Sequence, residues 1–262
     1  MSVMNMFSLE GKVAVVTGGA GKYGYQIVEA LLEAGATVYV ASRNKENNKN
    51  RLSHFVEAGY PVHVIELDLE RETSILLACE EIYAEAGQVD VLVNNAVLRC
   101  SDGYDIATAE QFDRSMHANA TGLFVISRAF GDRMAKAGRG SIINIGSYMG
   151  ILGPNYNLYN GTDMCPHGSV GDYFFHKGGM TSYTRFLASH YGRFGVRVNC
   201  AELGGLYNGQ DENFVKRYSD STMLGRMANE TDLKGLIVYL ASDASAYMTG
   251  ASLPLDGGYS AK

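Results

Sequence analysis

Cysteine and proline are scarce in this chain of 262 residues, which contains four of each. The cysteines, Cys79, Cys100, Cys165 and Cys200, form no Cys-x-x-Cys pair and no dense framework. This argues against a disulfide-rich secreted domain, and we expect free thiols in a reducing cytoplasm. Cys165 and His167 lie close together, but no further ligand stands at metal-binding spacing, so no metal is expected.

Basic residues are also few. The chain has 22 Lys and Arg against 28 Asp and Glu, a formal net charge of −6. No run of lysine and arginine stands out, which argues against a nucleic-acid partner. No apolar stretch approaches the roughly 20 residues that span a bilayer, and residues 1–12 lack the pattern of a signal peptide. We therefore expect a cytoplasmic protein with no membrane partner.

Glycine and apolar residues, by contrast, are abundant. Glycine occurs 31 times, 46% of the residues are hydrophobic and 19% are charged, whereas globular domains average about 25% charged residues. The chain can therefore bury a large core. The glycines show no short period, and they suggest tight strand–helix junctions. Because no linker, repeat or shift in composition interrupts the chain, residues 1–262 are predicted to form a single domain.

Short β-branched runs alternate with stretches whose apolar residues recur every three or four positions. The predicted strands are Lys12–Thr17, Thr37–Ala41, Val62–Glu66, Asp90–Val93, Ser141–Ile145, Val196–Cys200 and Ser252–Leu255. The predicted helices are Gly21–Ala34, Lys45–Ala58, Glu72–Ala86, one or two within Ala109–Lys136, Tyr173–Tyr191 and Leu233–Ser242. This alternation predicts an α/β fold, a doubly wound parallel sheet of the Rossmann type.

A glycine-rich loop, Thr17–Gly24, joins the first predicted strand to the first helix. Its glycines would let the backbone approach a pyrophosphate, and the helix N-terminus would supply free N–H groups and partial positive charge. The motif predicts a dinucleotide site, although a plain strand–helix turn would look similar.

The end of the second predicted strand bears on the choice of cofactor. An acid at Ser42 would bind the ribose 2′-hydroxyl and repel a 2′-phosphate. Instead Ser42 is followed by Arg43, and Lys22 lies in the first loop. Since guanidinium groups suit phosphate, NADP is favoured and NAD is the alternative; Arg43 could also be a solvated surface residue. Asp68 could accept a hydrogen bond from the adenine amino group, or cap the following helix.

Tyr173 and Lys177 stand one helical turn apart, so they share one face of a predicted helix. A free tyrosine has a pKa near 10, and a nearby ammonium group would lower that pKa toward working pH, as a general acid/base requires. The pair is weak evidence alone and becomes specific together with the nucleotide loop.

With these residues in view, the chain resembles the short-chain dehydrogenase/reductase family from Leu9 to the C-terminus. The motifs that carry the resemblance are Thr17–Gly24, Asp68, Asn94-Asn95-Ala96, Asn119, a strand ending at Ser147, Tyr173-x-x-x-Lys177, Arg197-Val-Asn199, Leu224-Gly-Arg226, Leu240-Ala-Ser-Asp243, and Thr249 through Gly258. The resemblance implies a pyridine-nucleotide oxidoreductase that assembles as a tetramer or dimer.

The resemblance also implies roles for residues. Tyr173 would exchange the proton of the substrate hydroxyl, Lys177 would lower the Tyr173 pKa and hold the nicotinamide ribose, and Ser147 would bond the substrate oxygen. Asn119 would hold a water that links Lys177 to solvent. The cofactor would contact Gly18, Gly21, Lys22, Tyr23, Gly24, Ser42, Arg43, Asp68, Leu69, Asn95, Ala96, Tyr173, Lys177, Gly204 and Leu206.

The sequence departs from the family pattern at several points. Lys22 stands where short members have glycine, Val97 replaces a glycine, and Leu203-Gly204-Gly205 stands where Pro-Gly is common. The spacing from Ser147 to Tyr173 is unusually long, and residues 151–172 are interpreted as an insertion rich in Asn and Tyr. A long loop at this position favours a role over the substrate, with an oligomer contact as the alternative.

We therefore expect an NADP-dependent enzyme that interconverts a secondary alcohol and a ketone and acts on a polar, sugar-like or polyol substrate. One alternative is a sugar-nucleotide-modifying enzyme that uses its cofactor transiently. It is disfavoured because the tail lacks an extra substrate domain. The other is a non-catalytic nucleotide-sensing protein, which would not need both Tyr173 and Lys177.

Overall fold

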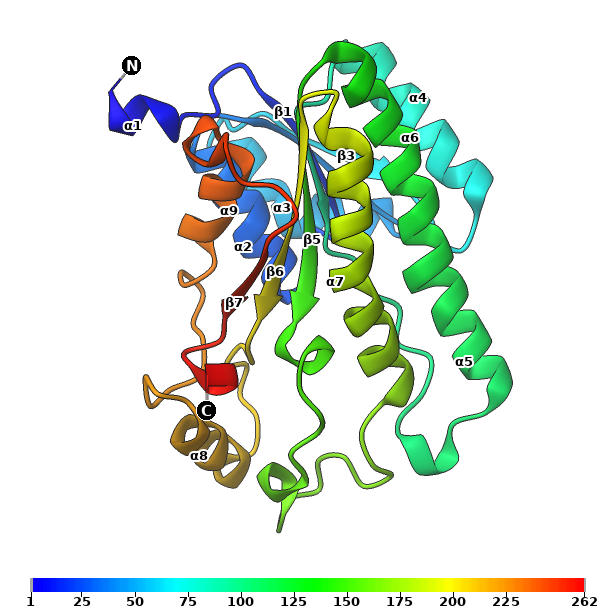
Figure 1. The fold of residues 1–262 in the computed structure, drawn as a ribbon, viewed down its shortest axis with the longest axis vertical. Coiled ribbons are helices and arrows are strands. Elements are labelled where there is room, and N and C mark those ends of the chain that lie inside the picture. The colour runs from blue at the N-terminus through cyan, green and yellow to red at the C-terminus, as the bar shows by residue number, and fades with distance from the viewer. Residues whose placement is uncertain (1, 262) are drawn as a thin grey trace.

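The computed structural model describes residues 2–261. A seven-stranded sheet lies at its centre, and every neighbouring pair of strands runs parallel in the order β3-β2-β1-β4-β5-β6-β7 (Figure 1). The strands are β1 Val13–Thr17, β2 Thr37–Ser42, β3 Val62–Glu66, β4 Val91–Asn94, β5 Gly140–Ser147, β6 Val196–Leu203 and β7 Ser252–Leu255. The predicted α/β fold with a parallel sheet is confirmed.

Helices cover both faces of the sheet because successive strand side chains point to opposite faces. In β1, Ala14 and Val16 join one core, and Val13 and Val15 join the other. The first core is closed by α2 (Lys22–Glu33), α3 (Lys45–Glu57) and α9 (Lys234–Ala241). The second is closed by α4 (Glu72–Ala86), α6 (Gly122–Ala137) and α7 (Gly171–Gly192), which lie together in Figure 1.

Four strands extend beyond their predicted C-terminal ends, β2 and β4 by one residue, β5 by two and β6 by three. β5 and β6 pair along their whole length, from Gly140 opposite Val196 to Ser147 opposite Leu203. Polar and glycine residues at the carboxyl ends of β5 and β6 obscure the strand pattern in the sequence. These residues are nevertheless strand, because they pair with the neighbouring strand. As a result, Ser147 is the last residue of β5 and lies where the carboxyl ends of the strands meet.

The predicted helical stretch Ala109–Lys136 is one nearly continuous helix of three parts. It begins with α5 (Ala109–Met116), whose first turn is closed by a capping box between Thr108 and Gln111. A π-helical turn, His117–Thr121, then connects α5 to α6. Such turns are frequently found at functional sites.

The sequence interpretation missed two helices, α1 (Val3–Met6) and α8 (Glu212–Ser221). Asp211 caps α8 by accepting from the N–H groups of Asn213 and Phe214, at 2.9 and 3.1 Å. Phe214 and Tyr218, spaced one turn apart, are buried. An aspartate cap followed by this spacing is the signal that could have revealed α8.

The path of the chain places a crevice at one edge of the sheet. From β1 the chain moves outward to β2 and β3, then crosses back to β4 on the other side of β1. The loops that follow β1 and β4 therefore diverge at the carboxyl ends of the strands. In open α/β sheets, ligands bind at this switch point.

Candidate active site

A cavity of about 980 Å³ opens at the carboxyl edge of the sheet. Of the predicted site residues, all except Asn119 line it: Gly18, Gly21, Lys22, Tyr23, Gly24, Ser42, Arg43, Asp68, Leu69, Asn95, Ala96, Ser147, Tyr173, Lys177, Gly204 and Leu206. These residues come from both halves of the chain, and the fold brings them to one place.

The glycine-rich loop approaches the helix so closely that side chains would not fit. Gly18 has a positive φ of 64°, and a Cβ on Gly24 would lie 2.2 Å from the carbonyl oxygen of Gly18. Gly21 begins α2 without any side-chain cap. The N–H groups of the first turn are therefore available at the cavity, which is the arrangement that binds a pyrophosphate.

Asn95 and Thr17 fix this loop against β4. The Asn95 amide donates to the carbonyl oxygens of Thr17 and Gly18, at 2.9 and 3.1 Å. The Thr17 hydroxyl accepts from the N–H groups of Asn95 and Ala96, both at 3.0 Å. The predicted residues Asn95 and Ala96 thus line the cavity, and the Asn95 side chain shapes the glycine loop.

Tyr23 joins the same loop to the far side of the cavity. Its hydroxyl donates to the carbonyl oxygen of Gly204 at 2.9 Å, and burial raises its pKa well above the usual value. A neutral phenol in this place ties α2 to the loop after β6.

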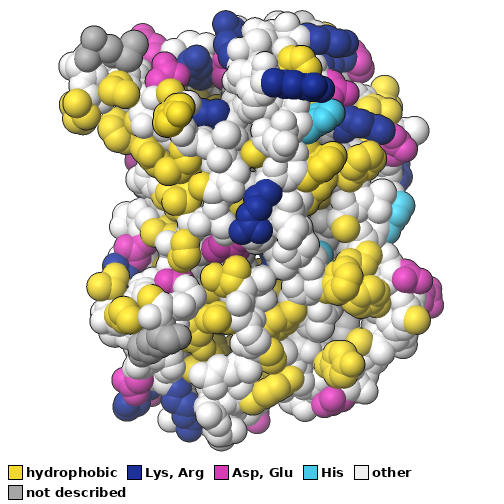
Figure 2. Space-filling view, in the orientation of Figure 1, with side chains coloured by type: hydrophobic (Ala, Val, Ile, Leu, Met, Phe, Trp, Pro, Cys, Tyr) yellow, Lys and Arg dark blue, Asp and Glu magenta, His cyan; other side chains and the backbone are white. Residues whose placement is uncertain are grey.

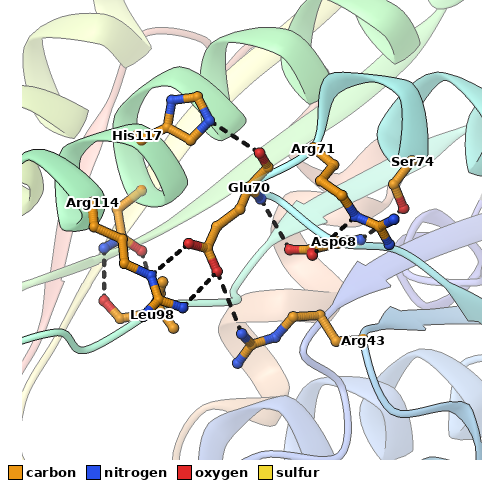
Figure 3. Close-up of polar contacts among 9 residues, drawn as sticks. Arg43, Asp68, Glu70, Arg71, Ser74, Leu98, Arg114 and His117 are labelled. Atoms are coloured by element: carbon orange, nitrogen blue, oxygen red, sulfur yellow. Dashed lines mark hydrogen bonds and ion pairs between the residues drawn. The ribbon is translucent and has the colours of Figure 1, made fainter.

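One end of the cavity carries a group of paired charges (Figure 3). Arg43 lies 3.6 Å from the carboxylate of Glu70. Arg114 donates to both oxygens of the same carboxylate, at 2.7 and 3.2 Å, and these bonds hold the pKa of Glu70 below its ordinary value. Ser42 accepts a hydrogen bond from the amide of Asn48. Arg43 therefore forms an ion pair at the cavity while its side chain stays 58% exposed.

Asp68 does not cap the helix that follows it. The N-cap residue of α4 is Arg71, and no side chain caps that helix. The Asp68 carboxylate instead accepts from the Glu70 N–H at 3.0 Å and from the Arg71 guanidinium at 3.2 Å. The capping alternative is thus wrong, and Asp68 remains a cavity-lining acceptor.

At the other end of the cavity, Ser147 and Tyr173 come together. Ser147 ends β5, and its hydroxyl accepts from the Met149 N–H at 3.2 Å. Tyr173 lies in the first turn of α7, close enough for Ser147 to lower its pKa. Lys177, one turn further, is 3% exposed and donates to the Ile145 carbonyl oxygen at 2.5 Å.

The electrostatics of Tyr173 differ from the sequence prediction. Burial raises the pKa of Tyr173 above its usual value, whereas Ser147 and the charge of Arg99 lower it. The Lys177 ammonium lies 5.7 Å from the ring centroid of Tyr173 and is bonded elsewhere. The predicted lowering of the Tyr173 pKa by Lys177 is therefore not found, because burial outweighs the neighbouring charges.

Burial also acts on Lys177 itself. It lowers the pKa of this ammonium group to about 8, while the nearby groups Cys200 and Glu202 raise it. A lysine that titrates in this range can change charge near neutral pH.

Asn119 lies in the π-helical turn with its side chain fully engaged. Its Oδ1 accepts from the Leu98 N–H at 2.8 Å, and its Nδ2 donates to the Leu98 carbonyl oxygen at 2.7 Å and to Ser115 at 3.1 Å. The side chain therefore holds the loop after β4 in place.

Glu202, on β6, is a site residue that the sequence interpretation missed. It is 0% exposed. Its carboxylate accepts from the Ser147 N–H at 2.7 Å and from the hydroxyls of Thr181 and Ser252 at 2.6 and 2.9 Å. A Cβ on Gly146 would lie 2.1 Å from this carboxylate, so glycine at 146 makes the space for it. Only the pairing of β5 with β6 reveals this arrangement.

Arg99 is a second residue that the sequence interpretation missed. It lies in the loop after β4 and lines the cavity. Its guanidinium carbon lies 5.1 Å from the ring centroid of Tyr173. A lone arginine in a loop gives no signal in the sequence.

The segment 151–172 is ordered by contacts at both of its ends. Its short 3₁₀ helix η4 (Tyr156–Tyr159) packs against α8, with the rings of Tyr159 and Phe214 5.4 Å apart. The His167 carbonyl oxygen accepts from the Asp105 N–H at 3.0 Å. Met164 lines the cavity.

Thiols, metal ligands and membrane-spanning helices were the other features that the sequence raised. The four cysteines have free thiols. No three His, Cys, Asp or Glu side chains between residues 2 and 261 are grouped to hold a metal. No helix in that range has the length and hydrophobicity needed to cross a membrane.

The cavity fits a dinucleotide. The Gly18–Gly24 cradle would be filled by any Cβ on Gly24, the uncapped N-terminus of α2 suits a pyrophosphate, and Ser147, Tyr173 and Lys177 stand at the opposite end. Fold and site together define a nucleotide-binding oxidoreductase.

Comparison with known proteins gives the family. The family described as "Enoyl-(Acyl carrier protein) reductase" matches residues 22–260. This chain belongs to the short-chain dehydrogenase/reductase family. It is an NAD(P)-dependent oxidoreductase of secondary alcohols and ketones, and it acts on small molecules.

Individual relatives cover nearly all of the chain. A 3-alpha-(or 20-beta)-hydroxysteroid dehydrogenase of Mycobacterium bovis is 36% identical over 95% of this chain and 90% of its own. A D-threitol dehydrogenase of Mycolicibacterium smegmatis is 30% identical over 100% and 98%. A gluconate 5-dehydrogenase from Burkholderia cenocepacia, solved in complex with NADP and tartrate, is 25% identical with a TM-score of 0.89 over 100% of both chains.

Proposed function

We propose that this protein is an NADP(H)-dependent dehydrogenase of a polar, sugar-like secondary alcohol, with Ser147, Tyr173 and Lys177 at its reacting centre. One observation carries the proposal. Ser147, Tyr173 and Lys177 line the same cavity as the glycine-rich loop, and Ser147 lies close enough to Tyr173 to lower its pKa. The gluconate and threitol dehydrogenases among the relatives support the substrate class.

Each residue of the proposed reacting centre has its own role in hydride transfer. When bound, the nicotinamide accepts or gives the hydride. Ser147 donates a hydrogen bond to the substrate oxygen, and Tyr173 takes the hydroxyl proton in oxidation or returns it in reduction. Lys177 holds the nicotinamide ribose and supplies positive charge beside the phenol. Asn119, whose side chain is engaged by Leu98 and Ser115, holds the loop after β4 in place.

The preference for NADP rests on the far end of the cavity. No carboxylate follows β2 at Ser42, while Arg43 and Lys22 both line this end. A guanidinium oriented by Glu70 suits a 2′-phosphate. The gluconate 5-dehydrogenase solved with NADP is a precedent among the relatives.

We also propose a cytoplasmic homo-oligomer, a tetramer or dimer. Aromatic side chains are exposed on α7, where Phe175 is 67% and Phe186 59% exposed. Figure 2 shows hydrophobic side chains gathered over α5 and α7. Sedimentation of the wild type and of Phe186→Ser tests this, and a wild type that sediments as a monomer would contradict it.

The central test is Tyr173→Phe, assayed by hydride transfer to NADP from polyols and aldonates. We expect turnover to fall by about 10²–10⁴-fold, the usual contribution of general acid–base catalysis, with NADP affinity retained. Tyr156→Phe, an exposed tyrosine on η4 that does not line the cavity, is the matched control. A Tyr173→Phe enzyme within threefold of wild type would refute the assignment.

A further inference from the structure

The catalytic end of the cavity contains a cation, Arg99, that forms no ion pair within residues 2–261. Arg99 lines the cavity, and its guanidinium carbon stands 5.1 Å from the ring centroid of Tyr173. Its charge lowers the pKa of Tyr173 and Lys177 on α7 and of Tyr159 on η4. Arg99 therefore faces both the acid/base helix and the segment 151–172.

The lack of an ion pair or hydrogen bond sets Arg99 apart from Arg43, Arg71 and Arg114, although Arg51 of α3, which also lines the cavity, has neither within residues 2–261. Among residues 2–261, no carboxylate lies within 4.0 Å of Arg99, and no protein acceptor is hydrogen-bonded to it. Arg43 and Arg114 share Glu70, and Arg71 is paired with Asp68.

The acids of the cavity are placed away from Arg99. The two that line it, Asp68 and Glu70, belong to the Arg43 end, where they are already paired. Glu202 is fully buried behind the wall, and its oxygens accept from Ser147, Thr181 and Ser252. The catalytic end is consequently cationic, with Arg99 and Lys177 both facing it.

The geometry leaves the guanidinium donors free for a ligand. The guanidinium lies over the Tyr173 ring, and its N–H groups, which donate to no acceptor among residues 2–261, can donate to a ligand. A carboxylate matches that fork with two parallel hydrogen bonds, and a neutral hydroxyl does not.

We propose that Arg99 binds a carboxylate of the substrate, so that the enzyme acts on hydroxy acids and their oxo forms in preference to neutral polyols. This inference rests on the proposed dehydrogenase function and specifies its substrate class. Arg99 positions the acid beside Tyr173 and takes no part in proton transfer.

The test uses matched acid–polyol pairs that share a carbon skeleton. Tartrate and threitol form one pair, and gluconate and glucitol the other. Binding of each to the NADP-loaded protein is measured by calorimetry, which needs no turnover. We expect at least one acid to bind ten times more tightly than its polyol. Arg99→Gln should reduce that acid's affinity by about 10–100-fold and change the polyol's by less than twofold.

Arg128→Gln serves as the control, because Arg128 is paired with Glu72 on the surface and does not line the cavity. The inference is overturned if neither acid binds better than its polyol, or if Arg99→Gln weakens acid and polyol equally. Hydride transfer from the same compounds is assayed separately. If no alcohol is oxidised, the dehydrogenase function fails while the calorimetry still decides the role of Arg99.

Discussion

At the scale of single residues, the reacting centre depends on a buried negative charge that lies outside the cavity. Glu202 holds the backbone of Ser147 at 2.7 Å, and its charge raises the pKa of both Tyr173 and Lys177. Burial has the largest effect on both pKa values; among the neighbouring groups, Ser147 lowers that of Tyr173, Arg99 lowers both, and Cys200 raises that of Lys177. Glu202 thus contributes to the pH range in which the pair works.

Glu202→Gln tests this effect with little change of shape. The amide oxygen can still accept from the Ser147 N–H, and the hydroxyls of Thr181 and Ser252 can rotate to accept from the new amide. Without the negative charge, the Tyr173 pKa falls, so the rising limb of alcohol oxidation should move to lower pH. The measurement is the pH profile of kcat/KM. Glu66→Gln, on the exposed edge of the sheet, is the control, and identical profiles for Glu202→Gln and wild type would contradict the prediction.

Arg43 is the residue on which cofactor choice is predicted to depend. Charge-assisted hydrogen bonds contribute about 1.5–3 kcal/mol, and exposure of Arg43 reduces that value. Arg43→Ala should therefore weaken NADP roughly tenfold and leave NAD nearly unchanged, as measured by fluorescence titration with both reduced cofactors. Arg128→Ala is the control. Equal losses for NADP and NAD would make Arg43 structural, and a wild type that prefers NAD would show the cofactor proposal to be wrong.

At the scale of elements, segment 151–172 connects the two halves of the reacting centre. It starts just after Ser147 and ends just before Tyr173, so it is tethered at both ends beside the cavity. Its contacts with α8 and with the loop at Asp105 hold it in a fixed position, and at Met164 it forms a wall of the cavity. Arg217 of α8 also donates to the Asn160 carbonyl oxygen.

We predict that this wall serves the substrate and not the cofactor. Met164→Ala, which alters the cavity surface, should raise KM for the substrate severalfold and leave NADP affinity intact, because walls and lids act by excluding water and completing the site. Shortening the segment should have the same effect more strongly. Tyr156→Ala, exposed and away from the cavity, is the control. Variants that alter sedimentation but keep normal kinetics would favour the oligomer contact instead.

At the scale of the whole molecule, stability is coupled to a histidine inside α7. His176 is 5% exposed, and neither ring nitrogen has a hydrogen-bond partner among the described residues. Burial, together with the charges of Lys177 and Arg99, lowers its pKa to about 3. The folded protein therefore keeps this imidazole neutral where the unfolded chain, with a pKa near 6.5, takes up a proton.

The sign of the effect follows from that difference. The contribution is present above pH ~6.5 and is lost as pH falls toward 3, at about 1.4 kcal/mol per pH unit for one proton. Urea unfolding at pH 7.5 and 5.5 should show a larger loss of unfolding free energy for wild type than for His176→Leu. Equal losses in the two proteins would exclude His176 as the source.

The sequence by itself determined the order of the elements, the glycine cradle and the pair Tyr173 and Lys177. These features depend on local chemistry: β-branched runs, apolar periodicity, glycines that a close approach requires, and a spacing of one helical turn. The residues chosen from the sequence come from both halves of the chain, and all but Asn119 line the cavity, because the motifs that mark them are short and contiguous.

Tertiary structure alone decided which charges act on that pair. Glu202 reaches Ser147 through the register of β5 with β6, Arg99 reaches Tyr173 through a loop, and burial raises the Tyr173 pKa that the spacing predicted to fall. Helix α8 differs, because its aspartate cap and its Phe214–Tyr218 spacing are visible in the sequence, and only its packing against η4 comes from contacts distant in sequence. Desolvation and long-range charge depend on what surrounds a group in space, and a linear pattern does not contain that information.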